Sequence, residues 1–252
     1  MTGPAAIISL EGVTKTFANA AGKAPYVAVD NLDLRVEQGQ MLALLGKTGC
    51  GKSTIFNMIA GLTEPSSGTV KVDGRNPFRD FDSFRGKIAI VFQGDRLLPW
   101  RTAIGNVELG LEMLDMPAGP RRATALRWLE MLGLRGHEHD YPHALSGGMR
   151  QRVSIARAFA TDANILLCDE PFSALDEMTG RALRAEFVKL VRDNGKTAVF
   201  ITHSINEALE IGDRLVVLKR PAAIALDIPL APTTSATERE AIRERIQDVL
   251  AA

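Results

Sequence analysis

Residues 46–53 constrain this chain more than any other segment, because they read GKTGCGKS and fit the phosphate-binding pattern G-x-x-x-x-G-K-[ST]. An apolar run precedes them and a helical pattern follows, so a strand should lead through a tight glycine loop into a helix N-terminus. Glycines let successive backbone N–H groups face one anion, and the helix dipole adds positive potential. We therefore expect nucleotide phosphates to be bound by Gly46, Lys47, Thr48, Gly49, Cys50, Gly51, Lys52, Ser53 and Thr54.

Three side chains in this loop have expected chemistry. Lys52 should reach the β- and γ-phosphates, and the Ser53 hydroxyl should hold Mg²⁺. Cys50 has two interpretations: a thiol activated at a helix N-terminus, or a small side chain that only fills the loop.

Composition limits the class of protein. The chain has 252 residues, 46% of them hydrophobic, which suffices for one large domain with a sizeable core. Its 30 basic and 30 acidic residues give zero net charge, which argues against a nucleic-acid-binding surface. We find no apolar run of about 18 residues and no secretion signal. Because Cys50 and Cys168 give no disulfide framework, we expect a reduced, cytosolic protein.

Apolar runs separated by helical patterns predict an α/β core with a mostly parallel sheet. Before this core, short strands and a hairpin loop at 18–25 predict an N-terminal antiparallel sheet. Residues from about 95 to 157 lack strong strand runs, which indicates an inserted helical segment. The runs of the core are 41–45, 88–92, 165–167, 199–201 and 215–218, and the N-terminal strands are 8–13, 26–29 and 32–36.

Capping residues and prolines predict where two helices begin. Thr102 should cap a helix that runs through Glu112, and Pro120 should open another that ends near Gly133. In the second helix we expect Leu126, Leu129 and Leu132 to face the core.

The C-terminal segment predicts a linker and a helix. Residues 229–234 contain two prolines, and a capping box follows at Ser235 or Thr237. We expect the apolar stripe of the final helix to pack on the body of the protein, with a partner contact as the alternative; the stripe is Ile242, Ile246, Val249 and Leu250.

The run 165–168 ends in two carboxylates, Asp169 and Glu170. The carboxyl ends of parallel strands line the ligand crevice of an open α/β sheet. In that place Asp169 can hold Mg²⁺ through water, and Glu170 can accept a proton from an attacking water.

Residues 145–151, LSGGMRQ, form a second glycine turn that opens a helix reaching about Ala160. Ser146 stands where an N-cap belongs, and its helix end makes a second anion site with Gly147 and Gly148. One chain thus carries two phosphate-binding helix ends.

Together these motifs resemble the nucleotide-binding subunit of an ABC transporter, since LSGG is similar to the family signature. Gln93 then matches the Q-loop, Asp176 the D-loop and His203 the switch histidine. Phe17 falls where the family stacks an aromatic ring on adenine, with Tyr26 as the alternative; such stacking contributes about 1–3 kcal/mol.

The resemblance implies one ABC ATPase domain over 1–252, with an α/β P-loop NTPase core. Core and β-subdomain would occupy 1–94 and 158–228, the helical subdomain 95–157, and the linker and last helix 229–252. It implies ATP and Mg²⁺ as cofactors, and two identical subunits that pair head to tail, so that Ser146, Gly147, Gly148 and Asp176 serve an ATP held by the partner. The implied catalytic residues are Lys52, Gln93, Glu170 and His203, and the metal site is Ser53, Gln93 and Asp169.

A narrower resemblance is to the nitrate/sulfonate/taurine branch of bacterial importers, carried by residues 97–102, 145–152 and 219–221. Departures stand at Lys47-Thr48, Gly94-Asp95 and Ala222, outside the core chemistry. This implies uptake of a small anionic solute through a separate permease, indirect partnership with a periplasmic or lipoprotein solute-binding protein, and a peripheral place on the cytoplasmic face of the inner membrane. The alternatives are a soluble ABC ATPase not coupled to transport and the ATPase of an exporter; we expect no nucleic-acid partner.

Three apolar residues follow Gln93 closely: Leu97, Leu98 and Trp100. Exposed apolar area beside a γ-phosphate sensor favours a groove for a short permease helix. The alternative is that all three pack into the helical subdomain.

Overall fold

The computed structural model describes residues 6–18, 25–231 and 235–251. Most of the expected hairpin loop at 18–25 and part of the linker at 229–234 lie outside these residues. The chain divides into two compact units, Met1–Phe84 with Val191–Ala252 and residues 85–190, and each is described by itself. The predicted α/β class with an N-terminal antiparallel sheet and a helical insertion is confirmed.

The first unit begins with a three-stranded antiparallel sheet in the order β2-β1-β4. It contains β1 (Ala6–Phe17), β2 (Tyr26–Glu37) and β4 (Ser67–Val72). The strands predicted at 26–29 and 32–36 are one continuous strand, in which Asn31 takes a positive φ of 41°. The pairing of β1 with β2 contains several register shifts, and these let the two strands remain paired on both sides of irregular residues such as Asn31. Strand β4 is an addition to the prediction.

The α/β part of the first unit carries the strand order β7-β3-β8-β9. Strands β3 (Met41–Gly46), β7 (Thr197–Thr202) and β8 (Arg214–Lys219) are parallel, and β9 (Ala223–Pro229) returns antiparallel to β8. All residues of β3 and β7 are buried, as expected of strands covered on both faces. The prediction omitted β9, whose residues are mostly half-buried or exposed.

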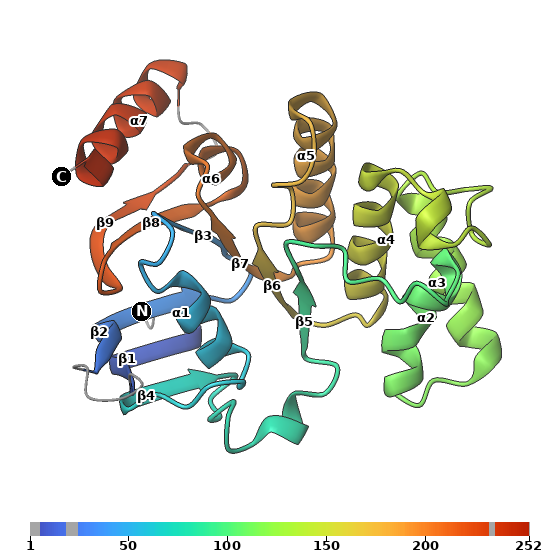
Figure 1. The fold of residues 1–252 in the computed structure, drawn as a ribbon, viewed down its shortest axis with the longest axis horizontal. Coiled ribbons are helices and arrows are strands. Elements are labelled where there is room, and N and C mark those ends of the chain that lie inside the picture. Colours follow the sequence, from blue (N-terminus) through green and yellow to red (C-terminus); the bar gives the residue numbers. More distant parts are fainter. Residues whose placement is uncertain (1–5, 19–24, 232–234, 252) are drawn as a thin grey trace. The chain divides into compact units, whose positions relative to one another are not determined.

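Among the described residues, this unit contains the complete α-helices α1 (Lys52–Ile59), α6 (Ile205–Ile211) and α7 (Ala236–Ala251). Helix α7 begins with the expected capping box, since the Ser235 N–H donates to Glu238 at 2.7 Å and the Glu238 N–H donates to Ser235 Oγ at 3.2 Å. Figure 1 shows α7 in red beside α6 and β9. Fully buried Ile246 joins the core there, with Ile242, Val249 and Leu250 partly buried against it, so the packing interpretation of this stripe is confirmed.

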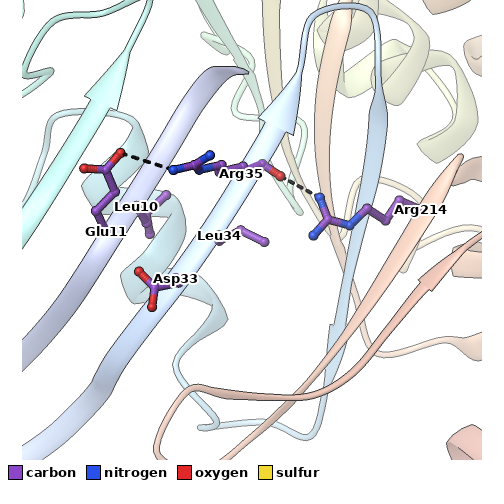
Figure 2. A pocket seen from close by; sticks show the side chains of 6 residues that line it. All are labelled: Leu10, Glu11, Asp33, Leu34, Arg35 and Arg214. Atoms are coloured by element: carbon purple, nitrogen blue, oxygen red, sulfur yellow. Dashed lines mark hydrogen bonds and ion pairs between the residues drawn. The ribbon is translucent and has the colours of Figure 1, made fainter. Parts of the chain in front are cut away.

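Arg214 links the two sheets of the first unit, as Figure 2 shows. Its guanidinium donates to the Arg35 carbonyl of β2 at 2.6 Å and to both oxygens of Asp227 in β9 at 2.7 and 2.5 Å. The hydrogen bonds to Asp227 raise the pKa of Arg214 above the ordinary value of an arginine. The adjacent pocket of about 340 Å³ also contains Glu11, which pairs with Arg35 at 4.0 Å.

The second unit joins a parallel strand pair to helices. Strand β5 (Ile88–Val91) pairs with β6 (Ile165–Asp169), and α2 (Ala103–Met113), α3 (Ala118–Met131) and α4 (Gly147–Ala160) contact one another (Figure 1). Helix α5 (Glu177–Asp193) crosses the division between the units. Thr102 caps α2 as predicted, accepting from the Gly105 N–H at 3.3 Å.

Helix α3 differs from the prediction in two ways. It begins at Ala118 after Pro117, so Pro120 lies inside the first turn rather than opening it. A proline is tolerated there because the first turn has no intrahelical partner for its N–H. Leu126 is 39% exposed, and Trp128 is buried on the core face in its place, packed 5.2 Å from the ring of Phe159.

Candidate nucleotide site

The phosphate-binding loop has the predicted setting between β3 and α1. Gly51 is the N-cap of α1 with φ of 107°, and a Cβ there would lie 2.4 Å from the Ala28 carbonyl oxygen. Gly49 also has a positive φ, 78°. Any other residue at position 51 would force the loop away from β2, so these glycines fix the path of the backbone.

The Lys52 ammonium is folded over the loop. Its Nζ donates to the Gly46 carbonyl at 2.6 Å and to the Lys47 carbonyl at 3.2 Å, and the side chain is buried. Among the described residues no side chain caps the N-terminus of α1, whereas Lys47, Thr48, Gly49 and Ser53 are exposed beside it. The first-turn N–H groups and one buried cation therefore form an anion site open to solvent.

Cys50 occupies the underside of this loop. It is 3% exposed, with Sγ 4.0 Å from Lys52 Nζ, and a Cβ on Gly46 would come within 2.6 Å of Sγ. Cys168 is fully buried in β6, and burial raises the pKa of its thiol well above the usual range. The burial of Cys50 favours its interpretation as a small residue that packs within the loop.

His203 lies at the same sheet edge as the loop. Parallel β3 and β7 place Leu45 opposite Thr202, so Gly46 and His203 are the next residues of neighbouring strands. His203 is exposed while Thr202 before it is fully buried. His203 and the phosphate-binding loop thus follow neighbouring parallel strands at their carboxyl ends, where ligands of open α/β sheets bind.

The two candidate adenine stackers differ in what already surrounds them. Tyr26 donates its hydroxyl to the Gly49 carbonyl at 3.1 Å, and the Arg220 guanidinium lies 5.0 Å from its ring centre. Phe17 is 40% exposed at the end of β1, with Lys15 Nζ 5.0 Å from its ring centre. Tyr26 is engaged in supporting the loop, which favours Phe17 as the stacking ring.

The second unit gathers its own group of candidate residues. Parallel β5 and β6 end together, and Gln93 Nε2 donates to Glu170 Oε2 at 3.4 Å. Glu170 is half-buried with a positive φ of 44°, which is uncommon for a glutamate. The Ser173 hydroxyl donates to the Glu170 carbonyl at 3.0 Å and supports this backbone. Strained backbone of this kind, which costs about 1–3 kcal/mol, often occurs at functional sites.

The signature turn and the D-loop residue are neighbours. Ser146 caps α4 by accepting from the Met149 N–H at 3.2 Å, and Asp176 caps α5 by accepting from the Thr179 N–H at 3.0 Å. That backbone bond lowers the pKa of Asp176. A Cβ on Gly148 would lie 3.1 Å from the Thr179 methyl carbon, so a glycine permits this close approach. Ser146 and Gly147 are exposed.

The candidate residues therefore fall into two groups. One surrounds the phosphate-binding loop in the first unit and includes Phe17 and His203; the other contains Gln93, Asp169, Glu170, the signature turn and Asp176 in the second. In the sequence, Arg220 and Arg150 belong only to the segments that carry the importer resemblance, and their contacts could not be predicted, since the sequence does not show which distant group an arginine will bond. Asp95 was noted only as a departure from the importer pattern.

The proposed metal ligands suit Mg²⁺ only in combination with a nucleotide. In the described part of the chain, no three His, Cys, Asp or Glu side chains gather as a metal site. A hydroxyl, an amide oxygen and one carboxylate are oxygen donors of the kind Mg²⁺ takes together with phosphates and water. Within the described ranges, every helix is too short or too polar to cross a membrane.

Comparison with known proteins identifies the family of this chain. Residues 29–173 match the family model described as ABC transporter. The taurine import ATP-binding protein TauB of Yersinia pestis bv. Antiqua is 44% identical over 76% of this chain and 73% of its own length. The nitrate import ATP-binding protein NrtD of Synechococcus elongatus is 38% identical over 92% of this chain and 84% of its own.

A solved structure adds the same result at the level of the fold. It is a dimeric ATP-binding cassette in a post-hydrolysis state bound to ADP and phosphate, with a TM-score of 0.78. Its sequence is 36% identical, and the match covers 89% of this chain and 99% of that one. The chain belongs to the ABC transporter family, as an ATP-hydrolysing ATP-binding protein of that family.

Proposed function

We propose that this protein drives the uptake of a small anionic solute by hydrolysing ATP on the cytoplasmic face of the inner membrane, through a separate permease. The observation that carries the ATPase part is the cradle between β3 and α1, with Lys52 buried over the loop. The import direction is supported by similarity to TauB and NrtD, whose names assign them taurine and nitrate import. A solute-binding protein would select the solute before it reaches the permease.

The chain's own residues supply most of the hydrolytic chemistry in this proposal. Lys52 would leave its carbonyl partners to neutralise charge on the β- and γ-phosphates, while the α1 N-terminus holds the anion. Glu170 would orient the attacking water and accept its proton, and His203 and Gln93 would contact the γ-phosphate. Bound Mg²⁺, held by Ser53, Gln93 and Asp169, would neutralise phosphate charge in the transition state.

Two copies of the chain would pair head to tail in this scheme. Each ATP would lie between the loop of one protomer and the signature turn of its partner, with Asp176 nearby. The support is that Ser146 caps a second anion-binding helix end, and that the similar cassette is dimeric. We assign 95–157 to the helical subdomain, 1–94 and 158–228 to the core with its β-subdomain, and 229–252 to the tail.

The permease contact would involve the segment after Gln93. Trp100 is 71% exposed, which favours the docking interpretation. Leu97 and Leu98 are half-buried, which favours packing into the helical subdomain. Fully buried Asn106 holds this segment: it accepts from the Leu98 N–H at 2.7 Å and donates to the Leu98 and Arg101 carbonyls. A backbone held on both sides of an exposed indole suits a docking anchor, since less backbone entropy is lost on binding.

Reconstitution with the permease tests the proposal. The subunit and its permease would be placed in proteoliposomes with the ATPase side and ATP in the lumen. The solute-binding protein and labelled taurine, nitrate or an alkanesulfonate would be added outside, and uptake into the lumen measured. We expect ATP-dependent accumulation that Lys52→Ala abolishes and Lys71→Ala, an exposed lysine of β4, leaves intact. ATPase activity without permease association would indicate a soluble ABC ATPase, and export of solute would indicate an exporter.

A further inference from the structure

Two arginines of α4 fasten the residues that follow Gln93. Arg150 Nε donates to the Asp95 carboxylate at 2.9 Å. Arg157, two turns later on the same helix, donates to the backbone carbonyls of Asp95 and Arg96, each at 2.9 Å. The segment that carries Gln93 is therefore bound to the signature helix through both side-chain and main-chain oxygens.

Arg150 also reaches back to the signature turn. Its Nη1 donates to the Leu145 carbonyl at 2.7 Å, directly before the capping residue Ser146. The other oxygen of Asp95 accepts from the Leu97 N–H at 3.2 Å. One guanidinium thus contacts both the turn that presents Ser146 and the segment that presents Gln93.

Stability alone does not account for this arrangement. The side chains of Asp95 and Arg150 are 28% and 36% exposed, and partly exposed ion pairs contribute about 0–1 kcal/mol. Both oxygens of Asp95 accept hydrogen bonds, and Arg150 donates to two segments of the chain. Such bonds fix the relative position of the two segments more than they stabilise the fold. The hydrogen bonds from Arg157 to the main-chain carbonyls of residues 95 and 96 also limit the movement of these residues.

We propose that the Asp95–Arg150 pair couples the two nucleotide sites of the dimer. In the proposed function, on which this inference rests, Gln93 contacts the ATP of its own protomer and Ser146 contacts the ATP of the partner. A shift of Gln93 toward the γ-phosphate then pulls residues 94–96, and Arg150 transmits the pull to the signature turn. The first ATP thereby prepares the chain to bind the second one.

A coupling of this kind is a reciprocal change in binding affinity, typically about 5–150-fold. It is best measured without hydrolysis, because reciprocity holds for binding and not for turnover. The parent protein for the test is therefore the Glu170→Gln variant, in which ATP binding by the dimer reaches equilibrium. Equilibrium dialysis with labelled ATP and sedimentation give the Hill coefficient and the dimer fraction on the same samples.

In this background Asp95→Ala and Arg150→Ala are each introduced alone and then together. We expect cooperative ATP binding by the parent and a Hill coefficient near 1 in both single variants. Because the two residues form one connection, the double variant should be no worse than either single one. Asp95→Glu keeps the carboxylate and should recover much of the cooperativity, which separates coupling from a folding defect.

The matched control is the exposed ion pair Arg135–Glu130 of the same unit, at 3.3 Å. Its alanine variants should keep the parental Hill coefficient. If the parent dimer forms and binds cooperatively while the Asp95 and Arg150 variants do the same, the coupling inference is wrong and the proposed function stands. Additive losses of the ATP-dependent dimer fraction in the double variant would also overturn it. Failure of the parent to dimerise with ATP would count against the proposed function itself.

Discussion

The hydroxyl of Thr202 donates to the carboxylate of Glu207 at 2.6 Å in the buried layer beneath His203. The same hydroxyl accepts from the Ser204 N–H at 2.9 Å, and Ser204 Oγ accepts from the Glu207 N–H at 3.3 Å. The residues on both sides of His203 are thus bound to the first turn of α6. These bonds hold the backbone that carries the exposed imidazole.

Thr202→Val should lower ATPase activity by misplacing His203, because valine keeps the shape but not the hydroxyl. Loss of the buried donor should also cost about 1–3 kcal/mol of unfolding free energy. Thr202→Ser should restore most of the turnover at unchanged KM for ATP, and Asn206→Ala, exposed on α6, serves as the control. Steady-state kinetics measure the loss of turnover, and thermal melts measure the loss of stability. Full activity in Thr202→Val would show that these bonds do not position the histidine.

Glu170→Gln should retain ATP binding and slow hydrolysis by about 10²–10⁴-fold, the usual contribution of a positioned general base. Trapped ATP should raise the dimer fraction in size-exclusion runs. Glu244→Gln, exposed on α7, is the control. Unchanged hydrolysis in Glu170→Gln would mean that another group accepts the proton.

Ser146→Arg and Lys52→Ala should each be inactive alone and partly active when mixed. In one arrangement of the mixed dimer both lesions fall in the same composite site, so the other site stays intact. A covalently linked heterodimer gives the clearest measurement. Activity no greater than that of either parent would contradict the head-to-tail arrangement, provided that one intact site suffices for turnover.

Trp100→Asp should leave the subunit folded and able to bind ATP, because the indole is 71% exposed. We expect it to prevent co-purification with the permease. Leu98→Asp, at a half-buried position beside Asn106, should also block assembly or transport, with a lower melting temperature than Trp100→Asp. Normal co-purification and transport of both variants would eliminate the docking role of this segment.

Neither cysteine of the folded protein should react readily with an aromatic disulfide reagent. Cys50 and Cys168 are 3% and 0% exposed, and the raised pKa of Cys168 keeps its thiol protonated at neutral pH. Both should react after denaturation. Rapid labelling of native Cys50 that ATP suppresses would instead support the activated-thiol interpretation.

Much of the molecule follows from short stretches of sequence whose physics is local. Glycines at 49 and 51 require a backbone that few other residues adopt, so the phosphate-binding loop is recognisable without a structure. Ser146 caps its helix because a short hydroxyl reaches an N–H three residues later, and sequence alone shows that spacing. For the last helix the same spacing left Ser235 and Thr237 open, and the structure places the cap at Ser235.

Other features depended on contacts between distant residues. Strand β9 contains an apolar run, but two of its first four residues are alanines, which have a low preference for strands, and the strand pairs with the edge of β8. Leu126 fits the apolar stripe as well as Trp128 does, and only the packing of α3 against α4 decides which of them is buried. Asp95 and Arg150 lie 55 positions apart, and the tertiary structure alone makes them partners. Local patterns determined the motifs, whereas the fold decided which side chains connect them, because such contacts depend on how distant segments pack.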